Sequence, residues 1–227
     1  MKNSLSPLFL FMTVVFTTCL LVSNLVAFKI VMLGTIVVPA GIFLFPVTYI
    51  INDCIAEVWG FRKARLMIWT AFGMNFFAVL FYQFAIALPP APFWEGQNAF
   101  ANVLRQTPRI AIASLLAFLV GSFLNAYIMS KMKSAMNGAK FSLRVIVSTI
   151  VGESADSTIF ITIAFLSILS WRQLLIMIAT QAFLKTAYEI IILPVTQRIV
   201  IYIKQREQTD IIDREISYSI WKITEVG

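Results

Sequence analysis

The chain has 227 residues, 59% of them hydrophobic and only 13% charged, and its mean hydropathy is +0.86. This composition excludes an ordinary soluble domain and is typical of a polytopic helical membrane protein. The apolar runs are continuous and do not alternate with polar residues, which excludes a transmembrane β-barrel. Histidine is absent, which weighs against a metalloenzyme or a Ser-His hydrolase. We therefore predict no metal site and no cofactor.

Six apolar segments predict an all-α protein with six transmembrane helices. The first, Ser4 to Phe28, is uncharged and long enough to span once. The second is expected to begin near Pro39 and to end at Trp59-Gly60, because Gly and Pro residues interrupt the run from residue 30. The other four are expected at Leu66 to the prolines of 89–92, Ile110–Ser130, Arg144–Ser170 and Arg172–Arg198. Residues 1–203 are expected to form one transmembrane domain, and residues 204–227 a short cytoplasmic tail.

Lysine and arginine are unevenly divided between the two ends of these helices. With the N-terminus inside, thirteen fall in cytoplasmic segments, at residue 2 and within 62–65, 131–144 and 198–222. The outside holds only four: Lys29, Arg105, Arg109 and Arg172. The positive-inside rule therefore predicts that both termini are cytoplasmic. The net charge of +7 is explained by this bias, without a nucleic acid partner.

The segment 148–160 places two carboxylates and several hydroxyls inside the fifth predicted helix. Glu153 and Asp156 are three residues apart, so they share a helix face. A helix that enters the bilayer near Arg144 puts Glu153 about 14 Å deep, close to the middle of a hydrocarbon core of about 30 Å. Ionisable groups at this depth usually mark a substrate or ion pathway.

Two other predicted helices carry acidic groups whose roles the sequence leaves open. Glu57 either pairs with the nearby cations of 62–65 at the interface or belongs to a buried site. Lys185 either pairs locally with Glu189, one turn further on, or serves the site. If all are ionised, five acids face this one lysine, an excess of four negative charges in a low dielectric. That excess favours a cationic or donor-rich substrate, or proton coupling.

A weak internal symmetry links the two halves of the chain. Polar groups recur in corresponding helices about a hundred residues apart: Asn24, Asp53 and Glu57, then Asn125, Glu153 and Asp156. Three helices per half would make this a 3+3 inverted repeat, with a site between the halves, as in many secondary transporters.

Three segments, 39–65, 152–160 and 185–194, together resemble the bacterial queuosine precursor transporters, also called the vitamin uptake transporter family. They occur in the same order, and the resemblance covers essentially the whole membrane region. It implies a multi-pass protein of the bacterial inner membrane that imports a 7-deazaguanine (preQ0, preQ1 or queuine) for tRNA modification. It further implies a secondary transporter with no enzyme activity.

The resemblance also implies a binding site for the guanine-like edge of the substrate. One carboxylate, of Glu153 or Asp156, can accept both N1–H and the exocyclic NH2 of the base. An amide or amine donor can bind O6, and a second acid can answer a substrate amine or carry a proton. The residues expected at the site are Asn52, Asp53, Asn125, Glu153, Asp156, Lys185, Tyr188 and Glu189. Candidates to stack on the ring are Tyr49, Phe160 and Tyr188.

Two alternatives remain beside this hypothesis. The chain has no Walker A motif, so a substrate-binding subunit would need a separate ATP-driven module. An intramembrane aspartyl enzyme would use Asp53 and Asp156, but no Gly-x-Gly-Asp element is present. The expected partners are the 7-deazaguanine and the lipid bilayer, and a homo-oligomer is compatible with the sequence.

Overall fold

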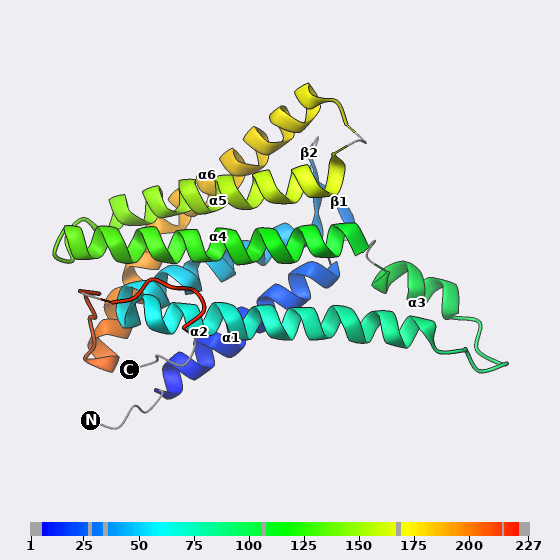
Figure 1. Ribbon diagram of the computed structural model, residues 1–227, viewed down its shortest axis with the longest axis horizontal. Coiled ribbons are helices and arrows are strands. Elements are labelled where there is room, and N and C mark those ends of the chain that lie inside the picture. Colours follow the sequence, from blue (N-terminus) through cyan, green and yellow to red (C-terminus); the bar gives the residue numbers. More distant parts are fainter. Residues whose placement is uncertain are drawn as a thin grey trace.

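Long apolar helices make up most of the chain in the computed structural model (Figure 1). The structure describes residues 6–26, 29–33, 36–105, 108–166, 169–214 and 216–222. Within these ranges five helices are long and apolar enough to cross a membrane: α1 (Pro7–Val26), α2 (Phe45–Ala87), α4 (Pro108–Ala135), α5 (Phe141–Phe165) and α6 (Trp171–Glu207). A shorter helix, α3 (Gln97–Leu104), lies between α2 and α4. The predicted all-α membrane protein is confirmed at this level.

Helix α2 consists of two helical segments that meet at Gly60. Gly60 has φ +79° and ψ 178°, a backbone conformation that residues with a side chain rarely adopt. Figure 1 shows the chain running to one end of the bundle in the first segment and turning back in the second. The break predicted at Trp59-Gly60 is confirmed, so α2 supplies two arms of the bundle.

A small hairpin, which the sequence analysis did not predict, joins α1 to α2. Strands β1 (Ile30–Leu33) and β2 (Ile36–Pro39) pair in antiparallel register, with Val31 opposite Val38. A 3-10 turn, Ala40–Phe43, then leads into α2. The expectation that no straight helix runs through this segment is confirmed. The isoleucines and valines between the Gly and Pro residues favour strands here.

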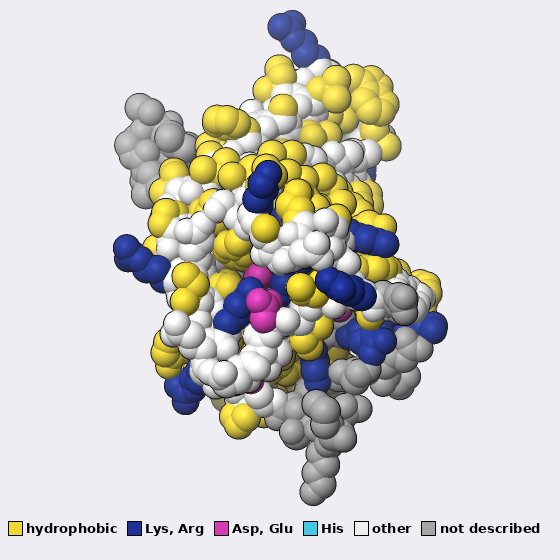
Figure 2. All heavy atoms as spheres, turned by 90° about the vertical axis from the view of Figure 1, so that its left-hand side faces the viewer, with side chains coloured by type: hydrophobic (Ala, Val, Ile, Leu, Met, Phe, Trp, Pro, Cys, Tyr) yellow, Lys and Arg dark blue, Asp and Glu magenta, His cyan; other side chains and the backbone are white. Residues whose placement is uncertain are grey.

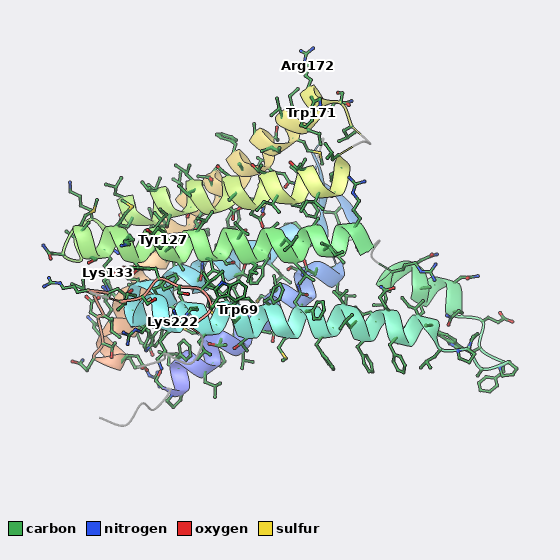
Figure 3. The ribbon with its side chains drawn as sticks, viewed as in Figure 1. Trp69, Tyr127, Lys133, Trp171, Arg172 and Lys222 are labelled. Carbon is green, nitrogen blue, oxygen red and sulfur yellow. The ribbon has the colours of Figure 1, made fainter. Side chains whose placement is uncertain are left out.

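The connections between helices divide between two ends of the bundle (Figure 1). One end carries the start of α1, the Gly60 turn, the turn between α4 and α5, and the end of α6. The other carries the hairpin, α3 and the start of α6. Figure 3 shows Lys133 at the first end, and Trp171 and Arg172 at the second. Figure 2 looks onto the first end, where Lys and Arg side chains are spread over the surface; we call it the basic end.

Large apolar side chains both fill the interior and cover the outside. Phe16, Ile55 and Met67 are fully buried where α1 and α2 pack. Phe183 and Ile191, on α6, are 71% and 75% exposed. An outer surface of this kind is the one that suits lipid, because the hydrocarbon core replaces water as the solvent.

Helices α4 and α5 approach each other closely at two glycines. A Cβ added to Gly152 would lie 3.0 Å from the Asn125 Cβ and 3.0 Å from the Gly121 carbonyl oxygen. A Cβ added to Gly121 would lie 2.9 Å from the Asp156 Cβ. Small residues allow such backbone contact between membrane helices. This contact fixes Asn125 and Asp156, two predicted site residues, at the α4–α5 interface.

Candidate functional site

Helices α5 and α6 are joined by ion pairs across their interface. Nζ of Lys185 lies 3.0 Å from Oε2 of Glu153 and 2.5 Å from Oδ2 of Asp156. The ammonium also lies 5.9 Å from the ring centre of Tyr49, on α2, whose side chain faces Glu153. We call Tyr49, Glu153, Asp156 and Lys185 the lysine cluster. Lys185 thus forms its ion pairs across helices, with Glu153 and Asp156.

A second buried group lies where α2, α4, α5 and α6 meet. The carboxyl of Asp53 faces the carboxyl of Glu189 and the side-chain amide of Asn125. Asn125 Oδ1 accepts a hydrogen bond of 3.1 Å from Asn52 Nδ2, and Glu189 faces the Thr149 hydroxyl. Asp53 is completely buried and Glu189 is 5% exposed. We call these five residues the carboxylate cluster.

The polar side of α5 explains how one helix contributes to both clusters. Its buried positions include Thr149, Glu153 and Ser157, spaced four residues apart along one face. In a lipid solvent the polar face turns inward and the apolar face outward. Thr149 was not singled out from the sequence, although it lies one turn before Glu153 in the same polar segment.

Glu57 forms a third group, at the basic end. It is 1% exposed. The Arg144 guanidinium binds both its oxygens, with Nη2 at 3.1 Å from Oε1. Nζ of Lys204 lies 2.6 Å, and Nζ of Lys133 3.7 Å, from the same oxygen. The cations thus come from α4, α5 and α6, and the interpretation that Glu57 pairs with the cations of 62–65 is wrong.

The aromatic candidates separate clearly. Tyr188 is 42% exposed on α6 and is the one predicted binding residue that the structure leaves outside both clusters. Phe160 is half-buried and packs edge-to-face on Phe165 at 6.3 Å. Tyr49, which sequence analysis offered only as a stacking candidate, belongs to the lysine cluster.

Comparison with known proteins finds one matching family model and two related transporters. Residues 39–199 match the family model described as "Putative vitamin uptake transporter". The chain is 28% identical over 147 residues to the "Probable queuosine precursor transporter" of Bacillus subtilis (strain 168), and 27% identical over 132 residues to the "Queuosine precursor transporter" of Escherichia coli (strain K12). These matches span 64% and 58% of this chain, and 64% and 55% of the two relatives. No solved structure matches the chain.

The family match covers every residue of the lysine cluster and the carboxylate cluster, and Glu57 as well. The family is one of transporters, which confirms the expectation of a transport protein and not an enzyme. The chain belongs to the vitamin uptake transporter family.

Proposed function

We propose that this protein imports a queuosine precursor of the 7-deazaguanine class across the bacterial inner membrane, as a secondary transporter. The observation that carries the proposal is the lysine cluster, in which the buried Glu153 and the partly buried Asp156 and Lys185 lie beside a tyrosine between membrane helices. The names of the two relatives support the choice of substrate class.

The chemistry of the lysine cluster suits the guanine-like edge. A carboxylate accepts N1–H and NH2 together, and an ammonium donates to O6. Oε2 of Glu153 lies 3.0 Å from Nζ of Lys185, whereas Oε1 has no hydrogen-bond partner in the part of the chain that the structure describes. Acceptor capacity is therefore left for a ligand. Tyr49 supplies a ring on which the base stacks.

The finer topology is part of the same proposal. We propose six spans, with the two segments of α2 counted separately, both termini in the cytoplasm, and a 3+3 inverted repeat. The alternating direction of successive segments in Figure 1 supports the six spans. The Lys and Arg side chains at the basic end support the orientation. Superposition of residues 6–87 on 108–207 tests the repeat, and a failure to align the helices would end it.

Residues 204–222 are assigned to the cytoplasmic side on the same argument. Helix α6 continues to Glu207, and the segment after it returns across the basic end. There Ile211 N–H donates to the Val58 carbonyl at 3.0 Å. The six-span proposal includes the expectation that residues 1–203 form one transmembrane domain, and the two are tested together.

Uptake by proteoliposomes tests the function directly. Purified protein is reconstituted alone, without ATP, and uptake of preQ0, preQ1 and queuine is measured with and without an imposed proton gradient. We expect uptake above empty liposomes, and expect Glu153→Gln and Asp156→Asn to abolish it. Glu95→Gln, in an exposed loop, is the matched control. Binding without uptake by wild type would favour a subunit that needs an ATP-driven module. Neither binding nor uptake would contradict the substrate class.

A further inference from the structure

The carboxylate cluster points to a second binding site, separate from the lysine cluster. We infer that Asp53 and Glu189 bind one coupling cation, a proton or Na⁺, whose entry drives uptake. The inference rests on the proposed function in that it treats the protein as a secondary transporter. It concerns different residues from those that bind the base.

The two carboxyl groups are buried together without a cationic partner. Asp53 is on α2 and Glu189 on α6, and their side chains face each other. None of the four carboxylate oxygens accepts a well-formed hydrogen bond from the residues that the structure describes, and the donors that face them, the Asn125 amide and the Thr149 hydroxyl, are neutral. Two ionised carboxylates side by side in a low dielectric each cost several kcal/mol. A positive charge must therefore join them when they are ionised.

The surrounding charges do not supply that positive charge. Arg144, the cation that acts on Asp53, is bound to Glu57 through two nitrogens. Lys185, one turn before Glu189 on α6, forms its ion pairs with the acids of the lysine cluster. Glu57 itself adds a further negative charge near Asp53.

Two weaker titratable groups also face the pair, and neither is cationic. The Cys54 thiol adjoins Asp53, and the Tyr49 phenol lies near Glu189. The local balance is therefore negative, and no ion pair within the described ranges neutralises it.

Neutral oxygen atoms complete the site. Thr149 Oγ1 faces Glu189, and Asn52 is linked to Asp53 through Asn125, whose Oδ1 accepts a hydrogen bond from Asn52 Nδ2. Thr149 and Asn52 are each 1% exposed, and neither Thr149 Oγ1 nor Asn52 Oδ1 makes a well-formed hydrogen bond with the described residues. Carboxylate, amide and hydroxyl oxygens are the ligands that hard cations prefer.

The number of acids favours a singly charged cation. Among the described residues, no group of three or more His, Cys, Asp and Glu side chains is placed to hold a metal ion. Two carboxylates with neutral oxygens suit one proton or one Na⁺ better than a divalent ion. Because Lys185 and Glu189 lie one turn apart on α6, a movement of this helix would couple the two sites.

The first test does not depend on the substrate. Thermal unfolding of the full purified chain in detergent is measured in NaCl and in choline chloride at equal ionic strength, over a series of pH values. A Na⁺ site predicts a higher Tm in NaCl, and a proton site predicts a Tm that rises as the pH falls. Either response should be lost in Asp53→Asn/Glu189→Gln and kept in the Glu95→Gln control. Equal responses in wild type and double variant would overturn the site. The single variants replace the double variant if it does not purify.

The second test separates a coupling cation from a substrate amine. PreQ0 carries a nitrile and no amine, whereas preQ1 carries a cationic aminomethyl group. We expect Asp53→Asn to lower gradient-driven accumulation of preQ0 by about tenfold or more. Accumulation equal to wild type, or a loss confined to preQ1, would overturn the inference. If wild type handles no 7-deazaguanine at all, the proposed function fails while the unfolding measurement still decides the cation site.

Discussion

Lys185 on α6 lies 3.0 Å from Glu153 on α5 and has Asp156 as a second acid partner. One ammonium is thus shared by two carboxylates, and the cluster keeps a net negative charge when all three groups are ionised. A substrate edge with two adjacent N–H donors can replace part of the contact that Lys185 makes with one of the acids. The lysine then remains bound to the other acid and is free to donate to the substrate carbonyl.

Removal of the lysine charge is the first prediction. Lys185→Gln leaves Glu153 and Asp156 without their shared cation, so like charges remain within the bundle. We expect uptake of preQ0 to fall at least about a hundredfold, since a buried charge pair that loses one partner costs about 3–5 kcal/mol. Lys185→Arg keeps the charge and should retain measurable uptake. Near-normal uptake by Lys185→Gln, with the protein present in the membrane, would contradict the role of the lysine.

The glycine contact between α4 and α5 gives the second prediction. Gly152→Ala places a Cβ 3.0 Å from both Asn125 Cβ and the Gly121 carbonyl oxygen, so the helices must separate. We expect a destabilisation of about 1–3 kcal/mol and reduced uptake. Gly73→Ala, on α2, is the matched control, because a Cβ there meets no atom within 4 Å. Thermal unfolding in detergent measures both, and equal Tm values for the two variants would rule out close packing at Gly152.

The third prediction concerns the C-terminal strap, residues 208–214 and 216–222. The Phe61 N–H, the first after the Gly60 break, donates to Asp213 Oδ2 at 2.7 Å across 152 residues of sequence. Asp213 thereby caps the second segment of α2, where helix N-terminal N–H groups favour an anion. Two more hydrogen bonds hold the strap. The Ser130 hydroxyl donates to Asp213 Oδ2 at 2.5 Å, and the Trp69 indole N–H donates to the Ile220 carbonyl at 2.7 Å.

Asp213→Ala should therefore destabilise the protein by about 1–3 kcal/mol, because a buried N–H loses its acceptor. Asp210→Ala is the comparison: that side chain is 50% exposed in its ion pairs with Lys133 and Lys204, and exposed pairs contribute less than about 1 kcal/mol. Limited proteolysis of the strap, followed by mass spectrometry, reports its release. Equal protection in wild type and Asp213→Ala would count against the cap.

The fourth prediction concerns pH and Asp210. Burial would raise the pKa of Asp210, but the ammonium groups of Lys133 and Lys204 outweigh it and hold the pKa below its usual value. A carboxyl whose pKa is lower in the folded state stabilises the fold above its unfolded pKa and loses that contribution as the pH falls through the folded pKa. We expect the difference in Tm between wild type and Asp210→Asn to be present at neutral pH and to vanish in acid. A difference that persists at a pH below the folded pKa of Asp210 would show that the charge is not its source.

The membrane class, the break at Gly60 and most of the site residues could be predicted from sequence, because lipid makes every polar residue within an apolar run conspicuous. The side chains with which these residues pair could not be predicted from sequence. Glu57 has arginine and lysine nearby in the sequence, yet its cations come from three other helices, and only the packing of the bundle decides this. Tyr188 and Tyr49 are equally aromatic, but their helix faces place one outside the bundle and the other beside Lys185. The hairpin at 30–39 was missed because Gly and Pro show where a helix stops without showing what replaces it.

The most direct test of the central claim is equilibrium binding of preQ0 to purified wild type, Glu153→Gln and Glu95→Gln in detergent. We predict saturable binding to wild type and to Glu95→Gln, and a loss of at least about tenfold in affinity for Glu153→Gln, since a charge-assisted acceptor becomes a neutral one. Equal affinity of all three proteins for preQ0 would contradict the assignment of the lysine cluster as the site that binds the base.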